Sequence, residues 1–182
     1  MTTAIGLRLA EAADAPALAA LIAESVMVLQ APDYSEAQRR GALGTVFGVD
    51  SRLIADRTYF AAEAGGLIVG CGGWSRRKTL FGGDAIAGKD DQALDPARDA
   101  ARIRAFFVRP GWTRRGIGGR ILEACEQAAR AAGFRRFELM ATLTGVPLYR
   151  ASGYELREAH EALLANGLRL PMIRMTKEAA GR

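Results

Sequence analysis

Cysteine and histidine are nearly absent from this sequence of 182 residues, which contains only Cys71, Cys125 and His160. A structural zinc site usually takes four Cys or His ligands, so these three residues cannot complete one, and we expect no metal. Neither cysteine lies in a motif that would support a Cys–His nucleophile. Each lies in an apolar stretch, which favours two buried free thiols in a reducing compartment.

Long apolar runs are missing too. No run in the sequence approaches the roughly 20 apolar residues of a membrane-spanning helix. The N-terminal residues lack the basic segment and apolar segment of a signal peptide. We therefore expect a cytoplasmic protein with no membrane partner.

A strong compositional bias is also lacking. Hydrophobic residues make up 49% and charged residues 25% of the chain, as in ordinary globular proteins, and the length suits one domain over residues 1–182. The net charge of +5 favours an anionic partner, such as a phosphate, a nucleic acid or a phosphorylated cofactor. The arginines are spread along the chain rather than concentrated among aromatic residues, so we expect no nucleic-acid partner.

Hydrophobic periodicity predicts a mixed α/β order, with hairpins at both ends and strand–helix units between them. The polar, glycine-rich residues 76–100 are either a mobile surface loop or a lid over a substrate site. Strands are expected near residues 5–9, 57–64, 67–74, 101–108, 137–141, 153–156 and 168–175, and helices near 16–28, 35–47, 116–132 and 146–151.

A segment rich in arginine and glycine, residues 109–120, joins the strand at 101–108 to the helix that follows. The first N–H groups of a helix have no partner within it, and they point outwards at its positive end. Glycines there let an anion approach the backbone. The segment therefore predicts an anion site formed by Arg114, Arg115, Gly116, Ile117, Gly118, Gly119 and Arg120.

Two common phosphate-binding motifs do not fit this segment. A P-loop needs Gly-Lys-Ser/Thr, which the sequence does not contain. A dinucleotide fingerprint needs a third glycine where Ile121 stands, and it follows its strand directly, whereas residues 109–115 intervene here.

Two patterns together resemble the GNAT superfamily of N-acetyltransferases, which transfer the acetyl group of acetyl-CoA to an amine. Gly116 and Gly118 match the Arg/Gln-x-x-Gly-x-Gly/Ala loop that binds pyrophosphate in this family, although Thr113 stands at its first position. Tyr149, Gly153 and Tyr154 match the Tyr-x-x-x-Gly-Phe/Tyr ending. The expected element order also fits the family over most of the chain.

The resemblance implies a mixed, mostly antiparallel twisted sheet of about six to seven strands. Helices would cover both faces, and the sheet would be splayed at its central parallel strand pair. Acetyl-CoA would be the cosubstrate, with its pantetheine arm pairing with the backbone near a bulge in the strand that ends at Val108. The implied cofactor contacts, besides the anion site, are Phe106, Phe107, Val108 and Thr142, the last standing where the family often has asparagine.

The resemblance also gives Tyr149 the role of the acid that protonates the departing CoA thiolate. The acceptor, a small-molecule or peptide amine, must lose a proton, since a free amine has a pKa of about 10.4. Glu63 is the best-placed candidate base, followed by His160 and Glu161, and a base acting through water or a positively charged site is an alternative.

Other interpretations stay open from the sequence alone. Arg102 and Arg104 are either a solvated face or a clamp for a substrate carboxylate or phosphate. The chain could transfer another acyl group from CoA, or be a non-catalytic CoA-binding module. Homodimers are common in this family, so a second copy of the chain is a candidate partner.

Overall fold

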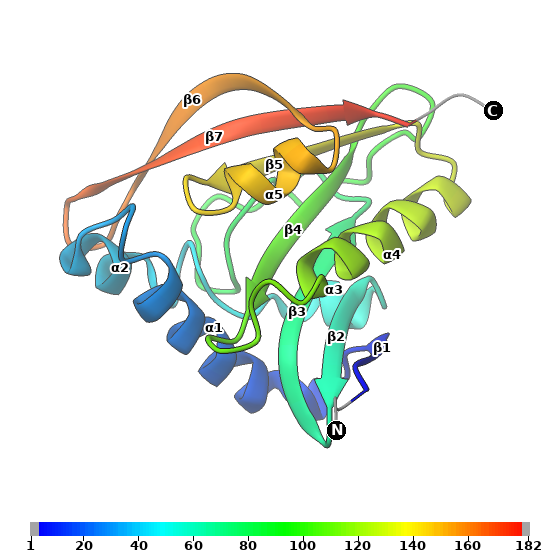
Figure 1. Ribbon diagram of the computed structural model, residues 1–182. Helices are drawn as coiled ribbons and strands as arrows, with labels where there is room; N and C mark the ends of the chain where they lie inside the picture. The colour runs from blue at the N-terminus through cyan, green and yellow to red at the C-terminus, as the bar shows by residue number, and fades with distance from the viewer. Residues whose placement is uncertain (1–3, 180–182) are drawn as a thin grey trace.

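Seven strands form one sheet in this computed structural model, which describes residues 4–179. The strand order is β1-β2-β3-β4-β5-β7-β6, and only the pair β4–β5 is parallel (Figure 1). This confirms the expected fold class. The strands are β1 (Gly6–Leu9), β2 (Tyr59–Ala64), β3 (Leu67–Ser75), β4 (Ala101–Val108), β5 (Arg136–Thr142), β6 (Glu155–Leu163) and β7 (Arg169–Glu178).

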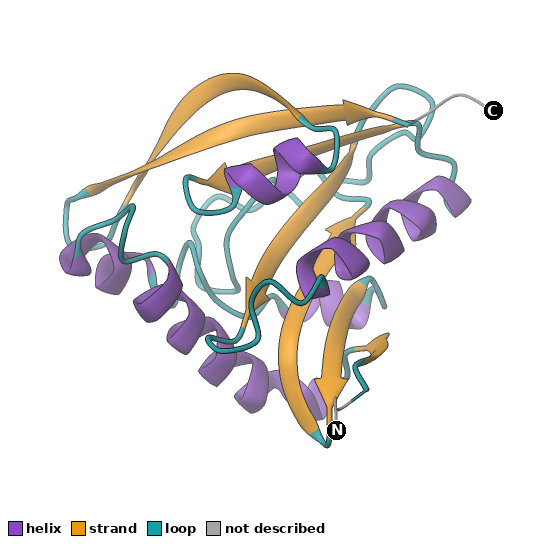
Figure 2. Cartoon of the chain, viewed as in Figure 1, coloured by secondary structure: helices purple, strands orange, loops and turns teal. Residues whose placement is uncertain are grey.

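Helices cover both faces of this sheet (Figure 2). One core holds apolar residues of α1 and the other those of α4, because neighbouring strand residues such as Ala61 and Ala62 point to opposite faces. The helices are α1 (Ala15–Leu29), α2 (Glu36–Ala42), α3 (Ser51–Ala55), α4 (Ile117–Ala131) and α5 (Val146–Ala151), with a 3₁₀ turn η1 (Ala12–Asp14) before α1.

Helix α1 buries one face at the spacing of three and four residues that is typical of a helix, with Leu18, Leu21, Ile22, Ser25 and Val26. Together with η1, residues 12–29 reach a mean hydropathy of 1.6, so this stretch is long and apolar enough to span a membrane by composition alone. The sequence expectation that no such stretch exists was wrong. A helix packed against the core of a globular domain passes the same test, so the observation is weak evidence for a membrane span.

The second helix is shorter than expected, and a third was missed. Helix α2 starts after Ser35, which forms a capping box with Gln38, but it ends at Ala42 rather than near residue 47. Gly44 follows with a positive φ of 83°, which breaks the helix. Helix α3 has only five residues, too few for hydrophobic periodicity to reveal it.

Strands β4 and β5 pair at one end only. Their parallel pairing covers Ala101 with Phe137 and Arg102 with Glu138, and beyond these residues the strands diverge (Figure 1). A bulge in β4 accompanies the divergence, because Cys71 pairs with Phe107 and Gly73 with Arg104, leaving two β4 residues opposite one of β3. The expected bulge and splayed pair are both present.

Ala105 lies in this bulge in the left-handed region, with a φ of 58°. Its carbonyl accepts a hydrogen bond from the hydroxyl of the buried Tyr59, at 3.0 Å. Opposite the bulge, a Cβ on Gly72 would lie 2.8 Å from the Phe106 ring, so only glycine fits there without a shift. The bulge is therefore held by a partly buried hydrogen bond and by close packing.

Replacing Ala105 with glycine is expected to stabilise the protein by about 0.5 kcal/mol. Glycine adopts the left-handed region without the penalty of about 1–2 kcal/mol that alanine has there. This gain outweighs the loss of the methyl contact and the greater conformational freedom of glycine in the unfolded chain. The matched control Ala141→Gly, on the buried face of β5, should instead destabilise by at least about 1 kcal/mol, because no strain is relieved. Urea unfolding measures both, and equal losses would contradict strain at Ala105.

Both cysteines are free and buried, as expected. Burial raises the pKa of the Cys71 thiol to about 12, and it raises the pKa of Cys125 well above its ordinary value. Neither thiol is therefore a ready nucleophile at neutral pH.

Candidate functional site

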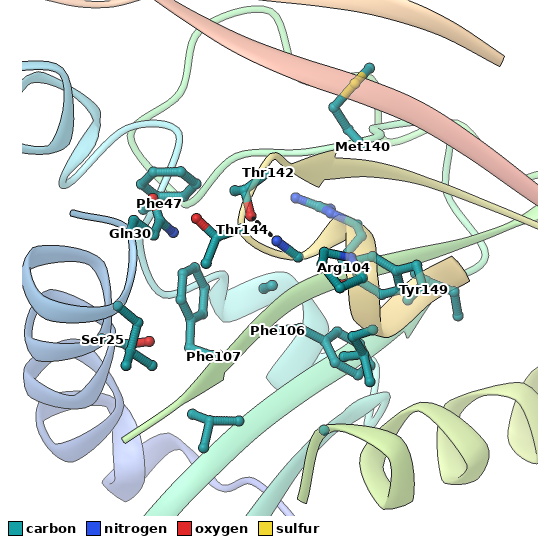
Figure 3. A pocket seen from close by; sticks show the side chains of 18 of the residues that line it. Ser25, Gln30, Phe47, Arg104, Phe106, Phe107, Met140, Thr142, Thr144 and Tyr149 are labelled. Atoms are coloured by element: carbon teal, nitrogen blue, oxygen red, sulfur yellow. Dashed lines mark hydrogen bonds between the residues drawn. The ribbon is translucent and has the colours of Figure 1, made fainter. Parts of the chain in front are cut away.

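A cavity of about 740 Å³ opens where β4 and β5 diverge. Its walls come from the end of α1 with the chain after α2, the segment 80–82, strand β4 with the start of α4, the segment from β5 to α5, and Met172 of β7. Figure 3 shows Ser25, Gln30 and Phe47 on one side of the cavity and Phe106 and Tyr149 on the other. The cavity thus joins two chemically different ends.

One end contains the N-terminus of α4. Gly116 is the N-cap of this 15-residue helix, has a φ of 75° and provides no side-chain cap, so the first N–H groups keep their capacity to bind an anion. A Cβ on Gly116 or Gly119 would meet no atom within 4 Å, so both backbones border open space. Gly116, Ile117, Gly118 and Gly119 all line the cavity.

The three predicted arginines of this region do not lie together. Arg114 lines the cavity. The Arg115 guanidinium lies 4.6 Å from the centre of the Trp112 ring and donates to the Gly111 carbonyl. Arg120 donates to the Ile5 carbonyl at 3.1 Å. Of the predicted anion contacts, Arg115 and Arg120 therefore lie outside the lining.

Strand β4 presents Phe106, Phe107 and Val108 to the cavity. The rings of Phe106 and Phe107 point to opposite faces: Phe106 packs edge-on against Tyr149, with ring centres 6.1 Å apart, and Phe107 against Phe47, at 5.9 Å. The backbone here lies beyond the last pair that β4 makes with β5. Its polar groups on that side are therefore available for an added, strand-like ligand.

Tyr149 lies on α5, four residues before Gly153. Gly153 follows the end of this helix with a φ of 90°, a conformation that favours glycine. The Tyr149 ring packs between Phe106 and Tyr154. Burial raises the pKa of the Tyr149 hydroxyl well above its ordinary value, so it keeps its proton at neutral pH. Nearby, the Thr142 hydroxyl lines the cavity and accepts a hydrogen bond from the Gly145 N–H at 3.0 Å.

The structure does not bring Glu63 to this cavity, which corrects its selection as the best-placed base. Its carboxylate accepts a hydrogen bond from Arg8 Nε at 3.0 Å. Glu63 pairs with Gly6 of the edge strand β1, far along the sheet order from the β4–β5 gap. The residue was selected from its strand position alone, and the sequence carries no signal for how β1 pairs with β2.

The two other candidate bases also lie outside the lining. His160 is exposed on β6 and packs edge-on against Phe81, with ring centres 5.5 Å apart. Glu161 is exposed and lies 3.8 Å from Arg169. Within residues 4–179, the cavity lining contains no carboxylate or histidine, and its ionisable side chains are Arg104, Arg114 and Tyr149.

The other end of the cavity is formed by the α1 region, the chain after α2 and the segment 80–82. Ser25 and Gln30 of the α1 region are buried and line it, as do Phe47 and the segment 80–82. This segment is hydrogen-bonded through its neighbours, with Gly83 donating to the Thr45 carbonyl at 2.7 Å. Of residues 76–100, the segment 80–82 therefore contributes to a cavity wall, and its role as a lid stays a prediction.

Tyr34 joins this end to the sheet. Its buried hydroxyl donates to the Pro171 carbonyl at 2.7 Å and accepts from the Leu143 N–H at 2.8 Å. Thr144 adds a hydrogen bond to Asp33 at 2.7 Å. The connection between α1 and α2 is thereby fixed against β7 and the β5–α5 turn.

Arg102 and Arg104 separate in the structure. Arg102 pairs with Glu138 of β5 and does not line the cavity. Arg104 lines it and is 5% exposed, so the alternative of a solvated face is wrong for this residue. Their spacing of two residues in the sequence predicts the same strand face for both arginines. Their difference in burial arises because the chain after α2 packs against Arg104.

The sequence matches the acetyltransferase (GNAT) family over residues 23–154. Among solved structures, a GCN5-related N-acetyltransferase from Rhodopseudomonas palustris is 24% identical with a TM-score of 0.71, covering 98% of both chains. The PaiA N-acetyltransferase of Thermoplasma acidophilum, solved with coenzyme A, is 14% identical with a TM-score of 0.65, covering 96% of this chain and 99% of that one.

A third similar structure is YncA, a putative acetyltransferase from Salmonella typhimurium, solved with acetyl-CoA. It is 14% identical with a TM-score of 0.65, and the match covers 99% of this chain and 96% of that one. A search of curated proteins gives no match. At these identities the solved structures establish a shared fold.

Proposed function

The chain belongs to the acetyltransferase (GNAT) family, and on that premise we propose that it is an N-acetyltransferase that moves an acetyl group from acetyl-CoA to a primary amine. One observation carries the proposal. A single cavity contains a helix N-terminus fit for phosphate, an open strand edge and a buried, protonated tyrosine. The acceptor is a small molecule or a peptide, and the proposed location is the cytoplasm.

The residues present fit acetyl-CoA. The uncapped N-terminus of α4, the open space at Gly116 and Gly119 and the charge of Arg114 suit its pyrophosphate. The free backbone of Phe106 and Val108 suits its pantetheine arm. When bound, the cosubstrate supplies an activated acetyl thioester. The chain's own groups then orient the thioester and exclude water.

Tyr149 is the proposed general acid. Its Oη holds a proton at neutral pH because burial disfavours the phenolate. A CoA thiolate resembles a cysteine thiolate, whose pKa is about 8.5, so a proton from Tyr149 helps its departure without being indispensable. Tyr149 lies beside the exposed edge of β4, in contact with Phe106.

The amine is proposed to lose its proton without a fixed base. Within the described residues no carboxylate or histidine lines the cavity, and two arginines do. A buried, positively charged site disfavours an ammonium ion, so it lowers the amine's pKa and selects the neutral nucleophile. The proton released on attack then leaves through water.

A panel of amines with acetyl-CoA, read by release of free thiol, tests this function. Acetylation of at least one amine, confirmed by the mass of the product, is the expected result. Turnover with propionyl-CoA but not acetyl-CoA would favour transfer of another acyl group. CoA binding without turnover of any amine or acyl donor would favour a non-catalytic binding module.

Arg114 and Arg115 form a matched pair that tests the phosphate end. Arg114→Gln is expected to weaken CoA binding about 5-fold, because an exposed charge–phosphate contact contributes about 1 kcal/mol. Arg115→Gln should leave CoA affinity unchanged, because its guanidinium lies over the Trp112 ring and Arg115 does not line the cavity. Calorimetry with CoA at low salt measures both. A loss confined to Arg115→Gln would reverse the assignment.

A further inference from the structure

Arg104 is a buried cation whose bonding capacity is largely unused. Its Nη2 donates to the Gly82 carbonyl at 2.6 Å and lies 2.8 Å from Asp50 Oδ2. A guanidinium has five N–H donors, and both of these contacts use the same nitrogen. Nε is buried and has no hydrogen-bond partner among the described residues. The guanidinium thus has donors to spare beside the cavity.

Arg104 shares its buried carboxylate partner with a second cation. Asp50 Oδ2 also lies 3.3 Å from Lys89 Nζ, so one buried carboxylate serves two cations. The other oxygen of Asp50 accepts the N–H of Arg52, as the cap of α3. Lys89 Nζ also lies 3.9 Å from Asp84 Oδ1, on a half-exposed carboxylate, so Asp50 is the buried carboxylate that offsets the charge of Arg104, and burial lowers the pKa of Arg104 despite Asp50. An anion bound there would offset the cost of burying this charge.

Apart from Ser25, apolar and aromatic side chains form most of the rest of this end. They suit the apolar part of a ligand, and among the described residues they provide no carboxylate to pair with a cationic group of the ligand. The lining contributed at this end by α1, the chain after α2, the segment 80–82, β5 and β7 includes Leu29, Val46, Phe47, Phe81, Met140 and Met172.

A second buried polar group lacks a partner at the same end. Gln30 is 5% exposed, lines the cavity, and its Oε1 accepts no hydrogen bond from the described residues. A buried acceptor without a partner costs free energy that a ligand N–H can recover. The wall at this end of the cavity thus contains an unused donor on Arg104 and an unused acceptor on Gln30.

We propose that the acetyl acceptor is an amphoteric amine with an apolar body, whose carboxylate binds Arg104 and whose N–H group hydrogen-bonds to Gln30. The substrate class is therefore that of apolar amino acids and related amino carboxylates. This inference rests on the proposed acetyltransferase function. Arg104 acts in it as a specificity-determining residue, since charge-assisted bonds from a guanidinium favour planar carboxylates.

Matched substrates test the proposal. L-Phenylalanine is compared with 2-phenylethylamine and L-leucine with 3-methylbutylamine, with 1,4-diaminobutane as a dication. The acid-bearing member of each pair should have a kcat/KM at least ~10-fold higher, expressed mainly in KM, and the dication should be the poorest acceptor. Acetylation of the decarboxylated amines with equal or greater efficiency would overturn the inference and leave the proposed function intact.

Variants locate the preference at Arg104. The double variant Asp50→Asn with Arg104→Gln removes both buried charges together, and asparagine keeps the cap of α3. It should lose the acid preference by at least ~10-fold while CoA affinity stays within ~2-fold of wild type. Arg102→Gln, on the same strand face but outside the cavity, is the control and should keep the preference. An acid preference that survives in the double variant would overturn the role of Arg104.

Binding gives a readout independent of turnover. Calorimetry of 3-phenylpropanoate, which has the carboxylate but no amine, uses the protein saturated with CoA. Wild type and Arg102→Gln should bind it, and the double variant should bind it at least ~10-fold more weakly. Equal binding by all three would overturn the inference. A wild type that binds no CoA would instead contradict the proposed function.

Discussion

Replacing Tyr149 with phenylalanine is expected to lower kcat about 100-fold while leaving CoA affinity nearly unchanged. General acid catalysis contributes about 10²–10⁴-fold, and a thiolate is a fair leaving group, so the low end applies. Only a hydroxyl is lost, and the ring contacts with Phe106 and Tyr154 remain. Stopped-flow measurement of thiol release, with the chemical step shown to limit the rate, gives the comparison.

Tyr154→Phe is the matched control for this variant. Tyr154 lies next to Tyr149, with ring centres 5.8 Å apart, but does not line the cavity. Its hydroxyl donates to the buried Glu126 at 3.1 Å, so its loss should cost about 1–3 kcal/mol of stability and leave kcat nearly unchanged. A Tyr149→Phe enzyme as fast as wild type would mean that the acid is another group, such as water.

The pH dependence of kcat provides a second check on Tyr149. An ordinary tyrosine loses its proton near pH 10, and the phenolate cannot act as an acid. Because burial raises the pKa of Tyr149, its acidic form persists to higher pH. Wild type should therefore show no alkaline loss of kcat from this residue up to about pH 10. A loss of activity centred near pH 8 that disappears in Tyr149→Phe would contradict the raised pKa.

Replacing Gly118 with valine is expected to weaken CoA binding at least ~10-fold, or about 1.4 kcal/mol. Gly118 lies in the first turn of α4 and lines the cavity. A Cβ at this position would already lie 3.0 Å from Leu148 Cδ2, so the larger valine side chain must occupy space towards the cavity. It would stand between the phosphate oxygens and the free N–H groups of the helix.

Gln127→Val controls for the effect of a β-branched residue in α4. Gln127 is exposed in the same helix, three turns from the N-terminus, and lies outside the cavity lining. This variant places the same β-branched side chain in the helix away from the cavity and should bind CoA normally. Gly118→Ala should fall between wild type and Gly118→Val. Unchanged calorimetric binding by folded Gly118→Val would contradict the location of the pyrophosphate site.

Local sequence was sufficient for much of the fold. The buried face of α1 follows from the spacing of its apolar residues. The two-residue period of a strand correctly predicts that the rings of Phe106 and Phe107 lie on opposite faces of β4. The glycines at 116 and 118 predicted an open helix N-terminus, which the structure contains. These features depend on neighbours a few residues apart, so a local pattern records them.

Less of the candidate site could be predicted from the sequence, because its residues come from distant parts of the chain. The sequence by itself determined the fold class and the helix whose N-terminus borders the cavity. Only the tertiary structure decided that Glu63 turns to Arg8, that Arg114 faces the cavity, and that Arg104 is buried while Arg102 is not. Register, the Ala105 bulge and the packing of residues 46–50 and 80–82 set these outcomes. Each depends on contacts between residues far apart in the chain, and hydrophobic periodicity does not report such contacts.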